Sequence, residues 1–594
     1  MNSSKYLPRI TIIIILLATV WLQFYVKGWK KNRIIEWDTM EYYSYLPATF
    51  IYKDLTFEFT KGNHEFFGKR FWPHRAENGK LVLKMSSGMA LVYSPFFLIA
   101  HAVAKPLGFE PDGFSPPYRM AIAFGAIVYL AIGLFLLSKL LRKYFSNLTV
   151  SLTLILVAFA TNLWYYSTIE PGMSHVYNFT FFVLFITLLD DWLKNPKLGR
   201  SICLGLTSGI ISLIRPTNAL IGIFFLLWGI SNFSNLKDRI LNLLKSWKYI
   251  LVIAGFAILV WIPQIIYWKL QTGNYFYYSY QNQGFFFLNP HIIDGLFSFR
   301  KGWFIYTPIM LVATLGIFLL PKYVKGSVLA ISIYLSLNVY IIFSWWSWWY
   351  GGSFGARPMI ESYAIMAFPL AAVVEHFTKR NRWIKYLSFS IFFLFISHGI
   401  LQTFQYYYGA IHWDSMTREA YLDSFGRLKP SSQFKYFIIR PDYNSALIGE
   451  KETQTSQQKK EKPYISIDEE KKSTTIFFEN ILSEKGTEFY EIYKDTIKLP
   501  QVPVTIKVEF EVDYNSIPKN LLFAVSLNDK NNQVLTYKDV NLNTLSKNKA
   551  QCLWETDIEN YSTDTLTLKV FFWSPDKESF TCKKIKVFIY GNNE

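Results

Sequence analysis

The sequence has few cysteines, and it has no glycine-rich phosphate loop after a strand pattern. Each of these features limits the kinds of site that the protein can contain. Only three of the 594 residues are cysteine. Cys203 lies in an apolar stretch, whereas Cys552 and Cys582 lie in the polar C-terminal region, where a disulfide would require an oxidising compartment. No glycine-rich loop follows a strand pattern, so a nucleotide site built on such a loop is not indicated.

Acidic residues are also outnumbered, since 43 Asp and Glu stand against 61 Lys and Arg and leave a formal net charge of +18. Such a balance can indicate nucleic-acid binding. Here many of the basic residues occupy short loops between apolar stretches, where they orient a protein in a bilayer. We therefore expect membrane lipid as the partner of this charge, and no nucleic acid.

Long apolar runs fill residues 10–402, after which the chain becomes polar and rich in lysine. Hydrophobic residues make up 51% of the chain, yet its mean hydropathy is only +0.17, which is typical of a membrane part joined to a polar part. Because a spanning helix needs about 20 mostly apolar residues, hydropathy predicts a polytopic α-helical protein with about eleven spans. They are 10–26, 119–141, 148–164, 178–189, 201–214, 219–230, 249–268, 303–320, 327–343, 359–374 and 385–402.

Basic residues in the short loops predict a cytoplasmic N-terminus. No small-residue cleavage site follows the first apolar run, so we expect that run to stay as a span. Residues 27–118 then form one large outer loop, in which 86–105 is expected to lie in the outer interface, because Pro95 favours a broken or surface helix. This outer loop contains four basic residues, although the positive-inside rule places basic residues in cytoplasmic loops. Their positive charge would suit the binding of either a phosphate or anionic lipid. The four residues are Lys27, Lys30, Lys31 and Arg33.

Two acids, Asp38 and Glu41, follow the first span among aromatic residues at the membrane surface. Acids beside a span are more often functional than acids on a soluble surface, because desolvating them is costly. Asp38 can be interpreted as the base of a membrane enzyme or as the N-cap of the short helix that follows.

Further polar residues face outward in the same topology. Arg215 lies at a break between two short spans, where it either contacts a ligand or snorkels. Glu170 and His175 either cap a helix or belong to a site. His64 and His74 lack tight ligand spacing, so no metal site and no cofactor is assigned, and a divalent metal is kept only as an option. The other outward-facing candidates are Lys84, His291, Arg300, Lys301 and Arg357.

The outer loop 269–301 is long and aromatic. Flat aromatic faces with a few amides and charges suit stacking against sugar rings, although an interfacial aromatic belt has the same composition. Beyond a charged linker at 431–462, short alternating runs separated by turn residues predict an all-β sandwich, jelly-roll-like, over 463–594. The membrane domain is expected to span 1–430.

Over about residues 1–430 the chain resembles the multi-span, GT-C type glycosyltransferases that use polyprenyl-phosphate sugars, such as protein O-mannosyltransferases and lipid A aminoarabinose transferases. Their first outer loop carries an acidic pair followed by Tyr. In Asp38-Thr39-Met40-Glu41-Tyr42, the first acid and Tyr42 match, whereas Thr39 replaces the second acid and Glu41 is displaced.

Three further positions carry the resemblance. Lys84 matches the basic residue before an interfacial helix, without the two prolines that often follow it. Arg215 matches a basic residue that contacts lipid phosphate in relatives, and Glu170 an acid between the third and fourth spans. Segments 295–308 and 348–358, which contain Arg300 and Arg357, also resemble bacterial members.

The resemblance implies transfer of a sugar from a polyprenyl-phosphate donor to an acceptor hydroxyl of a glycan, lipid or protein, with inversion, at the periplasmic face of the inner membrane. Asp38 and Glu41 would be catalytic. The substrate-binding residues would be Tyr42, Lys84, Glu170, His175, Arg215, Arg300 and Arg357.

Three other functions stay open. A transporter or flippase would place ionisable residues near mid-membrane and show repeats, and a glycan ligase would share the donor chemistry. A membrane anchor that only presents the β domain would leave the acidic first loop unexplained.

Overall fold

The computed structural model describes residues 3–61, 64–68, 70–450, 464–468, 473–482, 489–498, 505–516, 520–529, 533–541, 554–557, 565–576 and 581–592. They divide into two compact units, which we describe separately. Unit 1 comprises Met1–Phe434 and Ile438–Lys451, and unit 2 comprises Lys435–Phe437 and Glu452–Glu594. Residues 451–462 of the predicted linker lie outside the described residues.

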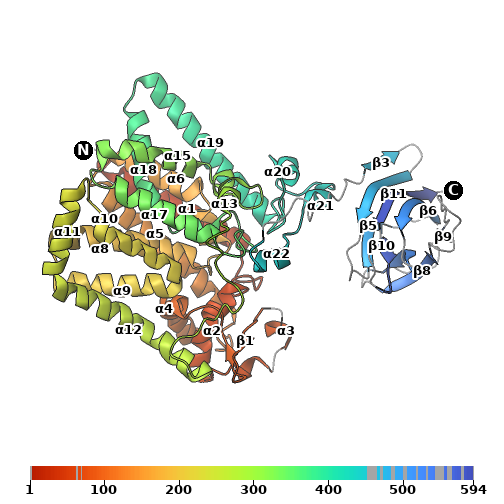
Figure 1. Ribbon diagram of the computed structural model, residues 1–594, viewed down its shortest axis with the longest axis horizontal. Helices are drawn as coiled ribbons and strands as arrows, with labels where there is room; N and C mark the ends of the chain where they lie inside the picture. Colours follow the sequence, from red (N-terminus) through yellow and green to blue (C-terminus); the bar gives the residue numbers. More distant parts are fainter. Residues whose placement is uncertain are drawn as a thin grey trace. The chain divides into compact units, whose positions relative to one another are not determined.

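Unit 1 is helical apart from a small hairpin of β1 (His74–Arg75) and β2 (Leu81–Val82) (Figure 1). Its α-helices are α1 Leu7–Val26, α2 Asp38–Phe50, α3 His64–Phe67, α4 Gly88–Ala104, α5 Pro116–Leu141, α6 Asn147–Phe159, α7 Leu163–Thr168, α8 His175–Lys194, α9 Leu198–Ile214, α10 Phe224–Leu227, α11 Phe233–Lys245, α12 Trp247–Thr272, α13 Ile292–Phe297, α14 Trp303–Tyr306, α15 Ile309–Leu315, α16 Leu320–Tyr323, α17 Val328–Phe343, α18 Tyr363–Thr378, α19 Arg382–Tyr407, α20 Arg418–Ser424 and α22 Tyr443–Leu447. Its 3₁₀ helices are η1 Ser3–Tyr6, η2 Glu58–Thr60, η3 Pro216–Ile223, η4 Gly316–Leu319 and η5 Arg357–Met359.

Five of these helices are long and apolar enough to cross a membrane, namely α1, α5, α8, α12 and α19. Shorter apolar helices occupy the other predicted spans, so the chain is a polytopic helical protein, while the number of eleven spans stays a prediction. The predicted span 303–320 is divided into α14, α15, η4 and α16. Its first break falls at Thr307, because the proline at 308 disfavours helical backbone in the residue before it.

Helix α4 runs unbroken through Pro95, so of the two alternatives, a broken helix or a surface helix, the first does not apply. A proline removes one backbone hydrogen bond and crowds the preceding turn. Here α4 packs against α2, α5 and α9, and this burial holds the helix together. Whether α4 lies in the outer interface stays a prediction.

Glycines set the close approach of the helices that carry the site. Gly205 and Gly209, four residues apart on α9, face the backbone of α12, where an added Cβ would lie 2.5 Å from Ile253 O and 2.8 Å from Ala257 O. Small residues at this spacing let membrane helices pack backbone to backbone. Gly88, at the start of α4, would clash with the backbone of Ile214 at 2.5 Å. These contacts fix the end of α9, where Arg215 begins the next segment.

Unit 2 contains two antiparallel sheets. The first residue of the short helix α21 (Phe434–Phe437) belongs to unit 1, and its other three residues belong to unit 2. One sheet has the order β5-β10-β7-β8 and the other β3-β4-β11-β6-β9. The strands are β3 Tyr464–Asp468, β4 Ser473–Leu482, β5 Phe489–Lys498, β6 Thr505–Ser516, β7 Leu522–Asn528, β8 Val534–Asn541, β9 Trp554–Asp557, β10 Thr565–Trp573 and β11 Thr581–Asn592.

Alternate residues of the central strands of the first sheet share one buried face. Val570 lies opposite Val525 and Phe572 opposite Phe523, and all four side chains are buried. The predicted antiparallel β structure is therefore found, whereas its stacking as a jelly-roll-like sandwich stays a prediction. Cys552 lies outside the described residues, so the disulfide with Cys582 stays a prediction as well.

Candidate active site

Asp38 is the first residue of α2 and forms an ion pair with Arg357, with 2.9 Å between Oδ2 and Nη2. The N-cap of α2 is Trp37, and no side chain caps the helix, so Asp38 does not serve as a cap. Trp37 has φ 53° and ψ −131°, which a non-glycine residue rarely adopts. Backbone strain of this kind is common where a functional side chain must be held in one direction.

Glu41 lies one helical turn after Asp38 and is buried. Its Oε2 accepts hydrogen bonds from the backbone N–H of Lys84 at 2.9 Å and of Met85 at 3.1 Å. Burial raises the pKa of this carboxyl to about 7, although the two N–H donors lower it in part. Glu41 thus holds the segment after β2 against α2, and the charges of Asp38 and Glu41 both act on the Lys84 ammonium.

Arg215 lies between α9 and η3 and donates from Nη1 to Oε1 of Glu361 at 3.3 Å. The same Oε1 lies 3.1 Å from Nδ1 of His175, the first residue of α8. All three side chains are largely buried, with exposed fractions of 18% for Arg215, 1% for Glu361 and 3% for His175. Arg215 is therefore a largely buried, paired cation, and among the described residues Glu361 is the one side chain to which it donates, which leaves further N–H groups that can donate to a ligand.

Three tyrosines connect these charged groups. The Lys84 ammonium lies 5.1 Å from the ring centre of Tyr280, and the Arg215 guanidinium lies 5.7 Å from that of Tyr350. Burial raises the pKa of the Tyr42 hydroxyl to about 12, so this hydroxyl stays protonated. The charges of Asp38, Arg215 and Arg357 all act on it, which shows that the three groups lie around Tyr42. Tyr350, like Trp37, has a left-handed backbone, with φ 56°.

Glu170 and Lys301 lie on the side of the cluster next to Arg357. Glu170 accepts a 2.8 Å hydrogen bond from the Tyr165 hydroxyl, and burial raises its pKa. Lys301 donates from Nζ to the backbone oxygens of Ser353 and, at 2.6 Å, Trp413. Burial lowers the pKa of Lys301 to about 7, with Glu170 and Arg357 among the charges that act on it. The N-cap of α8 is Ser174, so neither Glu170 nor His175 caps that helix.

The structure thus brings most of the predicted site residues into one cluster, namely Asp38, Glu41, Tyr42, Lys84, Glu170, His175, Arg215 and Arg357. Arg300 is directed elsewhere, because its guanidinium donates to the backbone oxygens of Asp414 and Ile439. His74 stacks on Tyr277, and the side chain of His64 lies outside the described residues. Across the part of the chain that the structure describes, no group of three His, Cys, Asp or Glu side chains could hold a metal ion.

The cluster can perform acid–base chemistry and bind an anion at the same place. Asp38 is 30% exposed, and among the described residues Arg357 is its only side-chain partner, so Oδ1 can accept a proton from a bound hydroxyl. Lys84 and Arg215 supply fixed positive charge within a partly buried setting, where such charge stabilises an anion strongly.

The fold is similar to those of two membrane glycosyltransferases. The apo oligosaccharyltransferase of Archaeoglobus fulgidus matches with a TM-score of 0.38 and 13% identity, over 72% of this chain and 57% of that one. Arabinosyltransferase EmbB from Mycobacterium smegmatis matches with a TM-score of 0.28 and 11% identity, over 84% of this chain and 59% of that one. The chain spans less than two thirds of the length of either protein. No family model and no curated protein matches the sequence.

Sequence reasoning missed Glu361, which links Arg215 to His175. It lies inside the predicted span 359–374, and an acid in an apolar span is itself a signal of function. Tyr280 and Tyr350 were not predicted as site residues either. The sequence contains 39 tyrosines, and the residues around these two do not distinguish them from tyrosines of an interfacial aromatic belt.

Proposed function

We propose that the protein is a membrane glycosyltransferase that moves a sugar from a polyprenyl-phosphate donor to an acceptor hydroxyl, with inversion. The observation that carries this proposal is the Asp38 carboxylate beside Arg357, with Lys84 and Arg215 fixed in the same cluster. A base for the attacking hydroxyl and cations for the leaving phosphate are the two groups that such a reaction requires.

In this proposal Asp38 Oδ1 takes the proton of the acceptor hydroxyl while Arg357 holds the carboxylate in place from Oδ2. The hydroxyl oxygen attacks the anomeric carbon, the bond from that carbon to the phosphate oxygen breaks, and lipid phosphate leaves. A single attack from the face opposite the phosphate inverts the anomeric centre. Lys84 and Arg215 neutralise the charge that develops on the phosphate.

Glu41 and Glu361 are assigned to positioning in the same proposal. Glu41 holds the backbone of Lys84 and Met85, and Glu361 holds Arg215, so each fixes one of the two cations. Tyr280 and Tyr350 present ring faces to those cations and can line the donor path. Tyr42, Glu170 and His175 complete the polar lining of the site. The reaction is assigned to the periplasmic face, with a glycan, lipid or protein as acceptor.

The proposal is tested with purified full-length protein in bilayer discs and a panel of polyprenyl-phosphate sugars. We expect at least one donor to release free polyprenyl phosphate, and to do so faster when an acceptor is present. Nucleotide sugars serve as the control donors and should give no transfer. Failure of every lipid-linked donor with folded protein would overturn the proposal, and release coupled to transfer of a whole glycan would identify a ligase instead.

A further inference from the structure

Helix α11 lies far from the candidate site, at the opposite end of the helical unit. Helix α8 begins in the site at His175 and ends at Lys194, about 30 Å away for 20 residues. Near that far end Trp228 donates to Asp190 at 3.2 Å, and the Arg239 side chain of α11 donates to the backbone oxygen of Trp228 at 2.9 Å. In Figure 1, α11 lies at the left edge and runs across the direction of α8 and α9.

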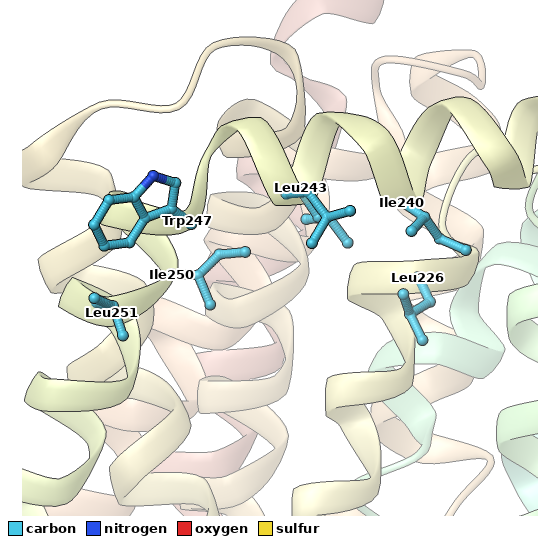
Figure 2. A pocket seen from close by; sticks show the side chains of 7 residues that line it. Leu226, Ile240, Leu243, Trp247, Ile250 and Leu251 are labelled. Atoms are coloured by element: carbon cyan, nitrogen blue, oxygen red, sulfur yellow. The ribbon is translucent and has the colours of Figure 1, made fainter.

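One face of α11 is apolar, and it closes the top of a groove between two other helices. The groove is lined by Leu226 from α10, by Ile240, Leu243 and Leu244 from α11, and by Trp247, Ile250 and Leu251 from α12, and it has a volume of about 310 Å³. Figure 2 shows α11 along the top, with the Leu243 side chain directed down between the two helices that descend from it. Leu244 and Leu251 are 64% and 60% exposed, so the described residues of the helical unit do not cover this face.

Three lysines lie on or next to the helices that line the groove, and the Lys248 ammonium lies 5.9 Å from the ring centre of Trp247, one of the lining residues. Lys237, Lys245 and Lys248 are exposed, and Asp238 is the only acid on α11. Within the described part of the chain, none of these lysines lies within salt-bridge distance of a carboxylate. Arg239 is occupied differently, since it donates to the backbone oxygens of Phe225 and Trp228 and thereby fastens α11 across the end of α10.

We propose that this groove binds an anionic phospholipid of the bilayer, with an acyl chain against Leu226, Leu243 and Leu251 and the headgroup phosphate on Lys237, Lys245 and Lys248. An apolar groove and three exposed lysines on the same two helices complement a lipid that has acyl chains and an anionic headgroup. An amphipathic helix with lysines on its polar side lies in the membrane interface, where anionic headgroups attract basic side chains. This inference does not depend on the proposed glycosyl transfer.

The test replaces Leu243 with the photoreactive residue p-benzoylphenylalanine in the full chain. The protein is reconstituted in phosphatidylcholine bilayers that contain phosphatidylglycerol as the minor component, irradiated, and analysed by mass spectrometry of the cross-linked lipid. We expect phosphatidylglycerol to be enriched about fivefold over its share of the bilayer, the factor expected for one lysine near a membrane surface. The same probe at Ile258, an exposed position further along α12, should report the bulk composition.

Two matched charge variants complete the test. Lys237→Gln/Lys245→Gln/Lys248→Gln should remove the enrichment at residue 243, whereas Lys139→Gln/Lys322→Gln/Arg382→Gln, which neutralises three exposed cations on other helices, should retain it. Cross-linking in proportion to bilayer composition would overturn the proposal. Cross-linking to a second copy of the chain would do so as well, because the groove would then be a protein interface.

Discussion

Asp38 and Arg357 are 319 positions apart in the chain, yet their side chains meet at 2.9 Å. Asp38 lies in the loop after the first predicted span, and Arg357 lies just before α18. The ion pair therefore joins the first loop to the segment 348–358, which is rich in Trp and Gly. Burial lowers the pKa of Arg357, but the charge of Asp38 more than offsets this and the pKa is raised above its ordinary value. Arg357 therefore remains a cation and holds Asp38 in one orientation.

The first prediction concerns that orientation. Arg357→Lys keeps the charge but loses the planar group that reaches Asp38, so we expect kcat to fall by at least about tenfold, since small displacements of a catalytic group are costly. The measurement is the steady-state rate of lipid-phosphate release. Arg382→Lys, at an exposed guanidinium, is the matched control and should leave the rate unchanged. An Arg357→Lys variant with the wild-type rate would show that the ion pair does not orient the base.

The second prediction separates donor binding from turnover at Arg215. Arg215→Ala should raise KM for the lipid donor by about tenfold or more, because a hydrogen bond to a charged group contributes about 1.5–3 kcal/mol, and should also lower kcat, because the charge that develops on the leaving phosphate loses one cation. Glu361→Gln should produce a smaller rise in the same parameter, since Arg215 stays charged but loses its anchor. Arg75→Ala, an exposed residue of the first loop, should leave KM unchanged. A loss confined to kcat in Arg215→Ala would remove this residue from donor binding.

The third prediction is a pH dependence at Glu41, whose pKa burial raises from 4.5 to about 7. A carboxyl with a raised folded-state pKa loses its stabilising contribution as the pH rises through that pKa. Below pH 4.5 both states bind the proton, and above about pH 7 the folded state holds a costly charge. Glu41→Gln should therefore be more stable than wild type at about pH 8, by about 3 kcal/mol at most, and should lose much of that advantage at about pH 5.

Thermal unfolding of both proteins in detergent at the two pH values provides this measurement. Glu77→Gln, at an exposed position of the same loop, is the control and should differ from wild type equally at both. If the difference between Glu41→Gln and wild type is the same at both pH values, Glu41 does not titrate in this range.

The fourth prediction concerns the packing that places Arg215. Gly88→Ala should lower the melting temperature and the donor affinity together, because its Cβ would lie 2.5 Å from the backbone nitrogen of Ile214, next to Arg215. Overpacking of this kind costs about 1–3 kcal/mol. Gly255→Ala on α12 is the matched control, since an added Cβ there meets no atom within 4 Å. An unchanged melting temperature for Gly88→Ala would contradict the close approach of α4 and α9.

Much of the site was predictable because Asp38 follows the first predicted span, Arg215 follows the fifth, and Lys84 precedes the apolar segment 86–105, so hydropathy indicates that all three lie near the membrane surface. Their partners were not predictable in the same way. Glu361 lies within a predicted span, and its pairing with Arg215 depends on how distant helices pack. Arg300 and Lys301 are adjacent in the sequence, and only the fold decides that Lys301 binds the backbone of Ser353 and Trp413 while Arg300 binds that of Asp414 and Ile439.

The capping alternatives failed for a related reason. A polar residue before an apolar run is typical of an N-cap, yet Asp38 lies one residue inside α2 and the N-cap position belongs to Trp37. Helix ends are rarely certain from sequence to within one residue. The side chain is therefore directed toward Arg357, and a one-residue shift of the helix start removes the capping alternative.

The most direct measurement of the central claim is acceptor-dependent release of polyprenyl phosphate by Asp38→Asn, compared with Asp294→Asn, which changes an exposed acid of the same type. We predict that Asp38→Asn stays folded in bilayers but loses at least about a hundredfold in turnover, the usual contribution of a general base, whereas Asp294→Asn keeps the wild-type rate. Turnover by Asp38→Asn within a few fold of wild type would contradict the assignment of Asp38 as the base.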